Sequence, residues 1–250
     1  MQNQRKHWLR IVAIIGSILG LLMPLNMVYA QHRNPQENFA ELSAQWWQWA
    51  FSIPPSKNPL FEATGDHCMV GQRGDLWFLG GSFIGSVTRT CTIPEGTTLF
   101  FPVANNVQFD SPNVCGQDDR SIPLRALRAN TTRSVDQVSS KTVTLDHKPI
   151  KNVHRVQSTV FEVTLPEENM FTFFSFDTPC PAGSYGPTVD DGYYVLLHPL
   201  NVGSHTLRIH TKTRSDTVAT EFTLDVTYIL NVVPVLFDEK QHPRQRDRAR

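Results

Sequence analysis

The chain has 250 residues, of which 40% are hydrophobic and 18% are charged, and its 23 basic residues equal its 23 acidic residues in number. This length can bury one sizeable core, as a single β domain or as two packed sheets. The balanced charge lacks the basic excess of a nucleic-acid-binding protein, so we expect no nucleic-acid partner.

Residues 1–30 have the composition of a secretory signal peptide. A basic start precedes an apolar run at residues 11–25, and Val28 and Ala30 are small residues at the spacing of a cleavage site. An uncleaved membrane anchor is the alternative, although the apolar run is shorter than the roughly 20 residues that a membrane span prefers. We therefore predict a secreted or periplasmic protein without a membrane span after cleavage.

The stretch 34–55 predicts a tryptophan-rich helix. Asn34 can cap its start, Glu37 can complete a capping box, and Pro54 and Pro55 end the helix because proline has no backbone N–H. The predicted apolar face consists of Phe39, Leu42, Trp46, Trp49 and Ile53.

Trp47 lies off this face, because successive helical residues are about 100° apart. It either fills a groove against a neighbouring loop or forms an exposed platform for a sugar ring or a partner. Large aromatic side chains are usually mostly buried, which favours the first interpretation.

The four cysteines all follow the predicted signal peptide. In an exported chain they predict two disulfides, for which three pairings are possible. We favour Cys68–Cys91, which would tie the loop after the helix to a strand, and Cys115–Cys180, which would join two long polar loops. The spacing has no C-x₂-C pairs, so we predict no cysteine-bound metal.

The rest of the chain predicts strands separated by turns and loops. Long polar loops are expected at 104–120 and 166–191, and a weak helical pattern runs from Ser121 to about Ser139. Residues 192–198 and 204–211 predict a hairpin. The other predicted strands are 76–79, 87–93, 97–103, 142–145, 155–165 and 222–232.

These elements predict a mainly β fold. We expect an antiparallel β-sandwich or jelly-roll-like arrangement, on which the N-terminal Trp-rich helix and one further short helix pack. It would form a single domain over residues 31–237. The tail at 238–250 is charged and poor in apolar residues, so we predict that it is disordered.

Five segments carry a resemblance that covers most of the mature chain. They are WWQWAFSIP, GQRGDLWFLGG, CTIPEGTTLFFPV, DGYYVLLHPLNVGSHTL and FTLDVTYILNV. Together they resemble segments of a group of uncharacterised exported bacterial β-sandwich proteins. The resemblance implies a fold and brings no activity with it.

Candidate metal ligands are few. His198, His205 and His210 lie close in sequence, but strand parity puts His205 and His210 on opposite faces. The pairs Asp118–Asp119 and Asp190–Asp191 are carboxylates of the kind that Ca²⁺ prefers, but neither fits an EF-hand. Turn formation by an Asp-Gly pair is the simpler interpretation of the second pair. We predict no metal and no cofactor, with calcium as the alternative.

The sequence offers carboxylate side chains for acid–base catalysis but no catalytic motif. No nucleophile motif or phosphate-binding loop is present in the sequence. A glycosidase needs two carboxylates that face each other across a cleft, and nothing in the sequence pairs any two of those available. The candidates, in or beside predicted loops, are Glu62, Asp66, Asp75, Asp177, Asp190 and Asp191.

Three functional hypotheses follow. The first is an exported non-catalytic β-sandwich protein that binds a glycan or a protein at the cell surface or in the periplasm, suggested by aromatic-rich loops at 61–78 and 171–194. The second is a secreted polysaccharide hydrolase that uses loop carboxylates, and the third is a structural protein without a ligand. We favour the first, because the second lacks any motif. Its candidate ligand-binding residues are Trp47, Asp66, Gln72, Asp190, Asp191 and Tyr193.

Overall fold

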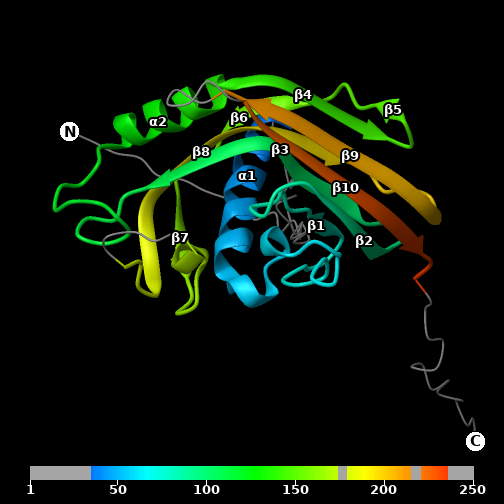
Figure 1. Ribbon diagram of the computed structural model, residues 1–250, viewed down its shortest axis with the longest axis horizontal. Helices are drawn as coiled ribbons and strands as arrows, with labels where there is room; N and C mark the ends of the chain where they lie inside the picture. Colours follow the sequence, from blue (N-terminus) through cyan, green and yellow to red (C-terminus); the bar gives the residue numbers. More distant parts are fainter. Residues whose placement is uncertain (1–34, 174–178, 215–220, 236–250) are drawn as a thin grey trace, which may run out of the picture. The chain divides into compact units, whose positions relative to one another are not determined.

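The structure, a computed structural model, describes residues 35–173, 179–214 and 221–235 (Figure 1). The predicted signal peptide, the capping residue Asn34, the carboxylate candidate Asp177 and the tail at 238–250 lie outside these residues. Within them, no helix combines the length and the apolar composition that crossing a membrane requires.

The predicted N-terminal helix is present as α1 (Pro35–Ser52). Trp46 and Trp49 of the predicted apolar face are buried, as are the other members of that face. Trp47 is also buried, with 5% of its surface exposed, so the interpretation of its ring as an exposed platform is wrong. Two short 3₁₀ turns, η1 (Pro55–Lys57) and η2 (Pro59–Phe61), follow the helix.

One five-stranded sheet, here called sheet A, lies against α1. Its long central strand β8 pairs antiparallel with β3 on one side and with β6 and β7 on the other, and β1 pairs parallel with β3. The strands are β1 (Leu76–Phe78), β3 (Thr98–Phe109), β6 (His154–Gln157), β7 (Phe161–Leu165) and β8 (Gly183–Leu197).

The second five-stranded sheet, sheet B, has the order β2-β10-β9-β4-β5. The β2–β10 pair is parallel and the other pairs are antiparallel. The predicted mainly β fold with two sheets is therefore confirmed, whereas the mixed strand order does not confirm a jelly roll. The strands are β2 (Val87–Pro94), β4 (Val138–Leu145), β5 (Lys148–Pro149), β9 (Gly203–Thr213) and β10 (Phe222–Val233).

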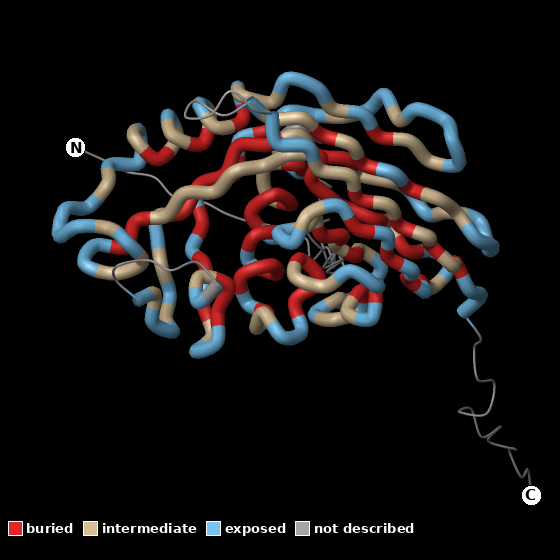
Figure 2. Tube along the Cα trace, in the orientation of Figure 1, coloured by how far each residue is buried: buried red, intermediate tan, exposed pale blue. Residues whose placement is uncertain are grey.

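Sheet A is covered on both faces. On one face, Phe100 and Tyr194 stack on each other with ring centroids 5.1 Å apart, within the cluster that contains α1. On the other face, Phe101 and Val195 belong to the cluster that contains sheet B. Alternation along β3 and β8 thus serves two cores, which explains why their apolar residues run consecutively. Buried residues concentrate in α1 and in these central strands (Figure 2).

The second predicted helix is α2 (Leu124–Asp136), which begins after Pro123. Its buried residues are Leu127, Thr131 and Val135, and it packs on β3 and β8. A third 3₁₀ turn, η3 (Met170–Phe173), lies within the predicted loop at 166–191.

Three local predictions are wrong. Residues 104–109 and 183–191 are not loops, because they extend β3 and β8, which pair with each other. The predicted hairpin at 192–211 does not form, because β8 belongs to sheet A and β9 to sheet B. The connecting residues therefore cross between the sheets.

Both disulfides have the favoured pairing. Cys68 bonds to Cys91, with Cα atoms 5.8 Å apart, and Cys115 bonds to Cys180, with Cα atoms 4.2 Å apart. The first ties a loop to β2, and the second ties the loop after β3 to the segment before β8.

Candidate functional site

The strand β3 has one edge that is open over most of its length. β1 covers this edge only from Thr98 to Phe100, whereas β8 pairs with the opposite edge as far as Phe109. Beyond Phe100, no strand among the described residues pairs with the edge of β3 that β1 covers. Unpaired backbone N–H and C=O groups on such an edge form a template for another extended chain.

A groove follows this open edge. It is formed by two adjoining cavities of about 650 Å³ and 350 Å³ that share Trp47, Phe83, Asn105 and Asn106. Every residue of β3 from Pro102 to Phe109 lines one or both cavities. A groove on a sheet face would contact only alternate residues. Contact with consecutive residues therefore places the groove along the strand edge.

The groove has apolar side walls. Trp47 and Phe51 of α1, with Phe171 of η3, line the larger cavity. Val135 of α2 and Leu224 of β10 line the smaller one. Two large rings in the lining are well exposed, Phe83 at 47% and Phe222 at 59%.

Amide side chains supply hydrogen-bonding groups in the groove. Asn105, Asn106 and Gln108 of β3 all line it. Asn106 Oδ1 is buried without a hydrogen-bond partner among the described residues. A ligand or a water with an N–H or O–H group would satisfy this oxygen.

A braced loop after β3 lines part of the larger cavity. Asp110 Oδ1 accepts hydrogen bonds from Gln117 Nε2 at 2.6 Å and from the Ile122 backbone N–H at 2.8 Å. Cys115 of this loop is held by its disulfide to Cys180. These contacts fix the loop as a wall of the groove.

Behind the groove lies the fully buried carboxyl group of Asp190. Its Oδ1 accepts from Trp47 Nε1 at 2.7 Å, and its Oδ2 accepts from the Tyr194 hydroxyl at 2.9 Å. Burial raises the pKa of Asp190 to about 8, against the opposing effect of these hydrogen bonds. The nearby Asp191 raises the pKa further.

Asp191 faces the opposite side of β8. The Arg155 guanidinium donates to both carboxylate oxygens at 3.1 Å, and Thr132 of α2 donates to Oδ2 at 3.0 Å. Hydrogen bonding to Asp191 also raises the pKa of Arg155. The prediction of an Asp-Gly turn is thus wrong, because both aspartates are buried in a strand with partners from α1, α2 and β6.

The other predicted ligand-binding residues are not gathered at the groove. Asp66 is exposed on a loop. Gln72 fastens its loop to β1, because its Oε1 accepts from the Phe78 N–H at 2.8 Å and its Nε2 donates to the Phe78 carbonyl at 2.7 Å. The Tyr193 ring lies under Lys141 Nζ, which is 3.8 Å from the ring centroid. Of the six predicted residues, only Trp47 lines the groove.

The edge of β2 in sheet B differs from that of β3, because a loop covers it. The Thr90 N–H donates to the Thr64 carbonyl at 2.8 Å, and Cys91 is bonded to Cys68 of the same loop. A Cβ on Gly65 would lie 2.3 Å from the Thr90 carbonyl oxygen, so only glycine allows this approach.

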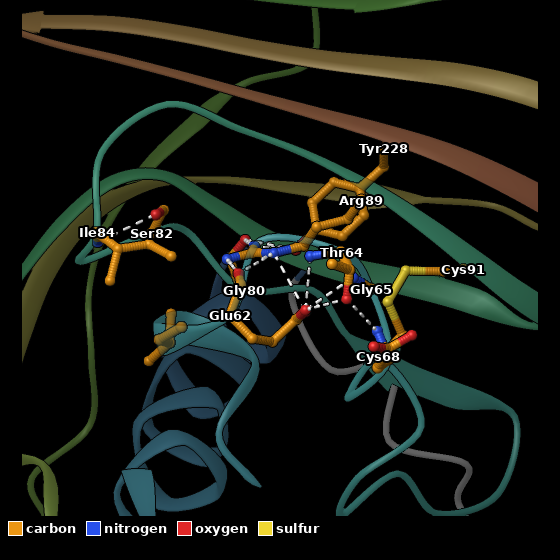
Figure 3. Close-up of polar contacts among 12 residues, drawn as sticks. Glu62, Thr64, Gly65, Cys68, Gly80, Ser82, Ile84, Arg89, Cys91 and Tyr228 are labelled. Atoms are coloured by element: carbon orange, nitrogen blue, oxygen red, sulfur yellow. Dashed lines mark hydrogen bonds and ion pairs between the residues drawn. A yellow bond between two sulfur atoms is a disulfide. The ribbon is translucent and has the colours of Figure 1, made fainter. Parts of the chain in front are cut away.

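The same loop is anchored by the buried Arg89, which the sequence analysis did not single out (Figure 3). Arg89 donates to the carbonyl oxygens of Glu62, Gly80 and Gly81 and to the Tyr228 hydroxyl. The Glu62 carboxylate lies 3.5 Å from Arg89 Nε. Burial raises the pKa of Tyr228. Alternation in β2, which puts Arg89 on the inner face with Val87 and Cys91, is the sequence signal that marks it.

No group of three or more His, Cys, Asp or Glu side chains in the described part of the chain could hold a metal ion. His205 instead contacts Asp146 Oδ2 through Nδ1 at 2.8 Å, and His210 contacts Asp225 at 3.0 Å. His198 is exposed and belongs to the crossing segment between the sheets.

Comparisons with known proteins add no family. Neither the protein-family models nor the curated proteins give a match. One solved structure that matches is the solution structure of amebosin, with 12% sequence identity over 59% of this chain and 96% of that chain and a TM-score of 0.17. A TM-score this low carries no argument about fold or function.

Proposed function

We propose that this protein is an exported, non-catalytic binding protein that takes an extended polypeptide segment of a partner as an added strand on β3. The observation that carries the proposal is the groove along the open edge from Pro102 to Phe109. Its backbone N–H and C=O groups are complementary to those of a second extended backbone, which is the basis of recognition by strand addition.

The walls of the groove suit the side chains of such a strand. Side chains of an extended segment point alternately to the two faces of the sheet. On the α1 side they would meet Trp47 and Phe171, and on the other side Val135 and Leu224. The expected partner segment therefore has about six to eight residues, at about 3.3 Å each, with apolar side chains in both alternating sets.

A glycan is the competing ligand class. Asn105, Asn106 and Gln108 offer the amide groups that hydroxyl-rich ligands use, and Phe83 offers an exposed ring. A polypeptide is favoured because it satisfies the edge N–H and C=O groups of β3 from Ala104 to Phe109 as well as the amides. The Val103 carbonyl oxygen, by contrast, already accepts from Thr211 Oγ1 at 2.8 Å. Peptide selection and polysaccharide binding, measured on the same protein, separate the two classes.

Export and the lack of catalysis have their own support. The predicted signal peptide agrees with two disulfides, which persist in oxidising compartments. Asp190 and Asp191 occupy successive positions of β8 and so face opposite sides of the sheet, which does not suit an acid–base pair.

The experiment selects peptides from a random display library on residues 31–250 and measures their affinity by calorimetry. Each peptide is then synthesised with a single backbone N-methyl group at each position in turn. If the peptide adds to β3, methylation at every second position weakens binding at least about tenfold, and methylation at the positions between has little effect, because alternate N–H groups face β3.

Soluble polysaccharides are tested on the same protein under the same conditions. Binding of a polysaccharide in the absence of any selectable peptide would replace the polypeptide with a glycan ligand. Peptide binding that is insensitive to N-methylation, or equally sensitive at all positions, would show that no strand is added. Either result would overturn the proposal.

A further inference from the structure

A hydrogen-bond chain connects the buried Asp190 to the groove. Asn105 Nδ2 donates to the Tyr194 hydroxyl at 3.1 Å, and that hydroxyl donates to Asp190 Oδ2 at 2.9 Å. The other carboxyl oxygen accepts from Trp47 Nε1 at 2.7 Å. The two ends of this chain, Asn105 and Trp47, both line the groove.

With Asp190 ionised, every donor in the chain points toward the carboxylate. The Asn105 amide must then direct its N–H to Tyr194, which leaves Oδ1 as its acceptor for the groove. Asn105 Oδ1 makes no hydrogen bond to a described residue. In this state the groove offers a hydrogen-bond acceptor at Asn105.

Protonation of Asp190 reverses the direction of the hydrogen bonds that link it to Tyr194 and Asn105. The indole N–H of Trp47 can only donate, so it keeps Oδ1 occupied and the new proton is placed on Oδ2. This O–H then donates to the Tyr194 oxygen, and the Tyr194 O–H needs a new acceptor. The Asn105 amide oxygen becomes that acceptor after the amide rotates, so the amide N–H₂ group turns to the groove.

The charged and titratable groups around Asp190 come from two elements. Asp191 and Tyr194 share β8 with it, and Arg128 of α2 donates to the Asp190 carbonyl oxygen at 3.3 Å. From α1, Asp190 meets Ser43 and Trp47, which do not titrate, and its register partner on β3 is Val107. Burial lowers the pKa of Arg128, which nevertheless stays cationic across the neutral range.

We propose that Asn105 determines ligand specificity in the groove, as an acceptor when Asp190 is ionised and as a donor when Asp190 is protonated. The part of this inference that concerns the ligand rests on the proposed function. The coupling of Asp190 protonation to the orientation of the Asn105 amide through Tyr194, here called the relay, is a property of the ligand-free protein. Since burial places the pKa of Asp190 at about 8, the exchange between the two states falls in the mildly alkaline range.

The relay is tested first without a ligand. The side-chain amide signals of Asn105, assigned with Asn105→Ser, are followed by NMR from pH 6 to 9.5, together with the Asp190 carboxyl carbon. In the wild type, we expect the Asn105 amide signals and the Asp190 carboxyl carbon to titrate with the same inflection. In Asp190→Asn, the Asn105 signals should stay constant. In Tyr194→Phe the carboxyl still titrates but the chain is cut, so the Asn105 signals should not follow it.

Two results would overturn the relay: Asn105 signals that do not titrate in the wild type, or signals that titrate equally in Tyr194→Phe, which would indicate a direct electrostatic effect. Near-ultraviolet circular dichroism checks that each variant is folded. If Tyr194→Phe does not fold, the wild type is tested by the nuclear Overhauser effect between the Asn105 side-chain N–H₂ and the Tyr194 ring. It should be present at pH 9.5, when the amide donates to Tyr194, and lost at pH 6, and an effect that persists unchanged at pH 6 would overturn the relay.

The ligand part uses peptides selected at pH 6. Such a peptide should bind the wild type at least about fivefold more weakly at pH 9.5, within the usual range of coupling between sites, and Asp190→Asn equally at both pH values. Parallel pH profiles for the two proteins would overturn the specificity role and leave the proposed function standing. A failure to select any peptide, with the NMR relay intact, would overturn the proposed function alone.

Discussion

The edges of β2 and β3 show two ways of ending a sheet. On β2, the Thr90 N–H is paired with the loop at Thr64, Gly65 lies against the strand, and a disulfide holds the loop in place (Figure 3). On β3, the edge beyond Phe100 meets no described strand and borders a groove instead. Proteins usually cover or charge their edge strands, because an open edge pairs with other chains.

This difference indicates that the open edge is maintained for a purpose. The chain uses a buried arginine, a glycine with φ of +102° and a disulfide to cover β2. On β3, Asp110 and a second disulfide instead brace the loop beyond the edge, which lines the groove. The covered edge of β2 is therefore expected to govern stability, and the open edge of β3 is expected to govern binding.

The largest effect should follow from Arg89→Ala, which removes the anchor of the β2 cover. The substitution leaves the Glu62 and Gly81 carbonyl oxygens without the Arg89 donor, and it removes the ion-pair partner of the Glu62 carboxylate. Breaking a buried charge pair in this way costs about 3–5 kcal/mol of unfolding free energy. Urea denaturation measures it, and Thr88→Ala, at an exposed position of β2, should stay within about 0.5 kcal/mol. Equal effects of the two substitutions would show that Arg89 is not an anchor.

The next largest effect should follow from removal of the Cys68–Cys91 disulfide as Cys68→Ala with Cys91→Ala. Its sequence separation of 23 predicts a loss of about 3 kcal/mol. Hydrogen exchange should also accelerate at the Thr90 N–H, because its loop acceptor is released. Removal of Cys115–Cys180 should destabilise the protein without this local change. If Thr90 responds equally to both, the disulfide does not hold the edge cover.

The Asp190→Asn substitution should have an effect on stability whose size depends on pH. In the unfolded chain an aspartate ionises near pH 3.9, whereas the buried Asp190 keeps its proton up to about pH 8. Between these values the folded state binds more protons, so wild-type stability falls as pH rises. The variant, which resembles the protonated acid, should be more stable than the wild type at pH 9 and should lose this advantage toward pH 4. Thermal unfolding across this range checks it, and parallel curves would contradict it.

Features with local signals could be predicted from the sequence. The spacing of Phe39, Leu42, Trp46 and Trp49 predicts the buried face of α1 because a helix repeats every 3.6 residues. The predicted disulfide pairing also agrees with the structure.

The site could not be predicted in this way, because it depends on contacts between distant residues. Asn105, Asn106 and Gln108 are polar residues that resemble a loop, but they are tolerated in β3 because its edge borders a groove. Asp190 has the pattern of a turn, yet its partner Trp47 is 143 residues away in sequence. The alternation of Val107 and Phe109, which pack toward α1, is the one local sign that β3 continues beyond Val103.

The smallest effect on stability should come from Gln108→Lys, and it should have the clearest effect on binding. Lysine on an edge strand opposes pairing with another chain, and its flexible stem can keep the charge in water. Because Gln108 is only partly buried, unfolding free energy should change by less than about 0.5 kcal/mol. The affinity of a selected peptide should nevertheless fall at least about tenfold in calorimetry. The matched control is Thr92→Lys, at an exposed position of the covered strand β2, which should change neither quantity. If both lysines weaken binding alike, the added charge and not the edge of β3 is responsible, and the contrast between the two edges would not extend to function.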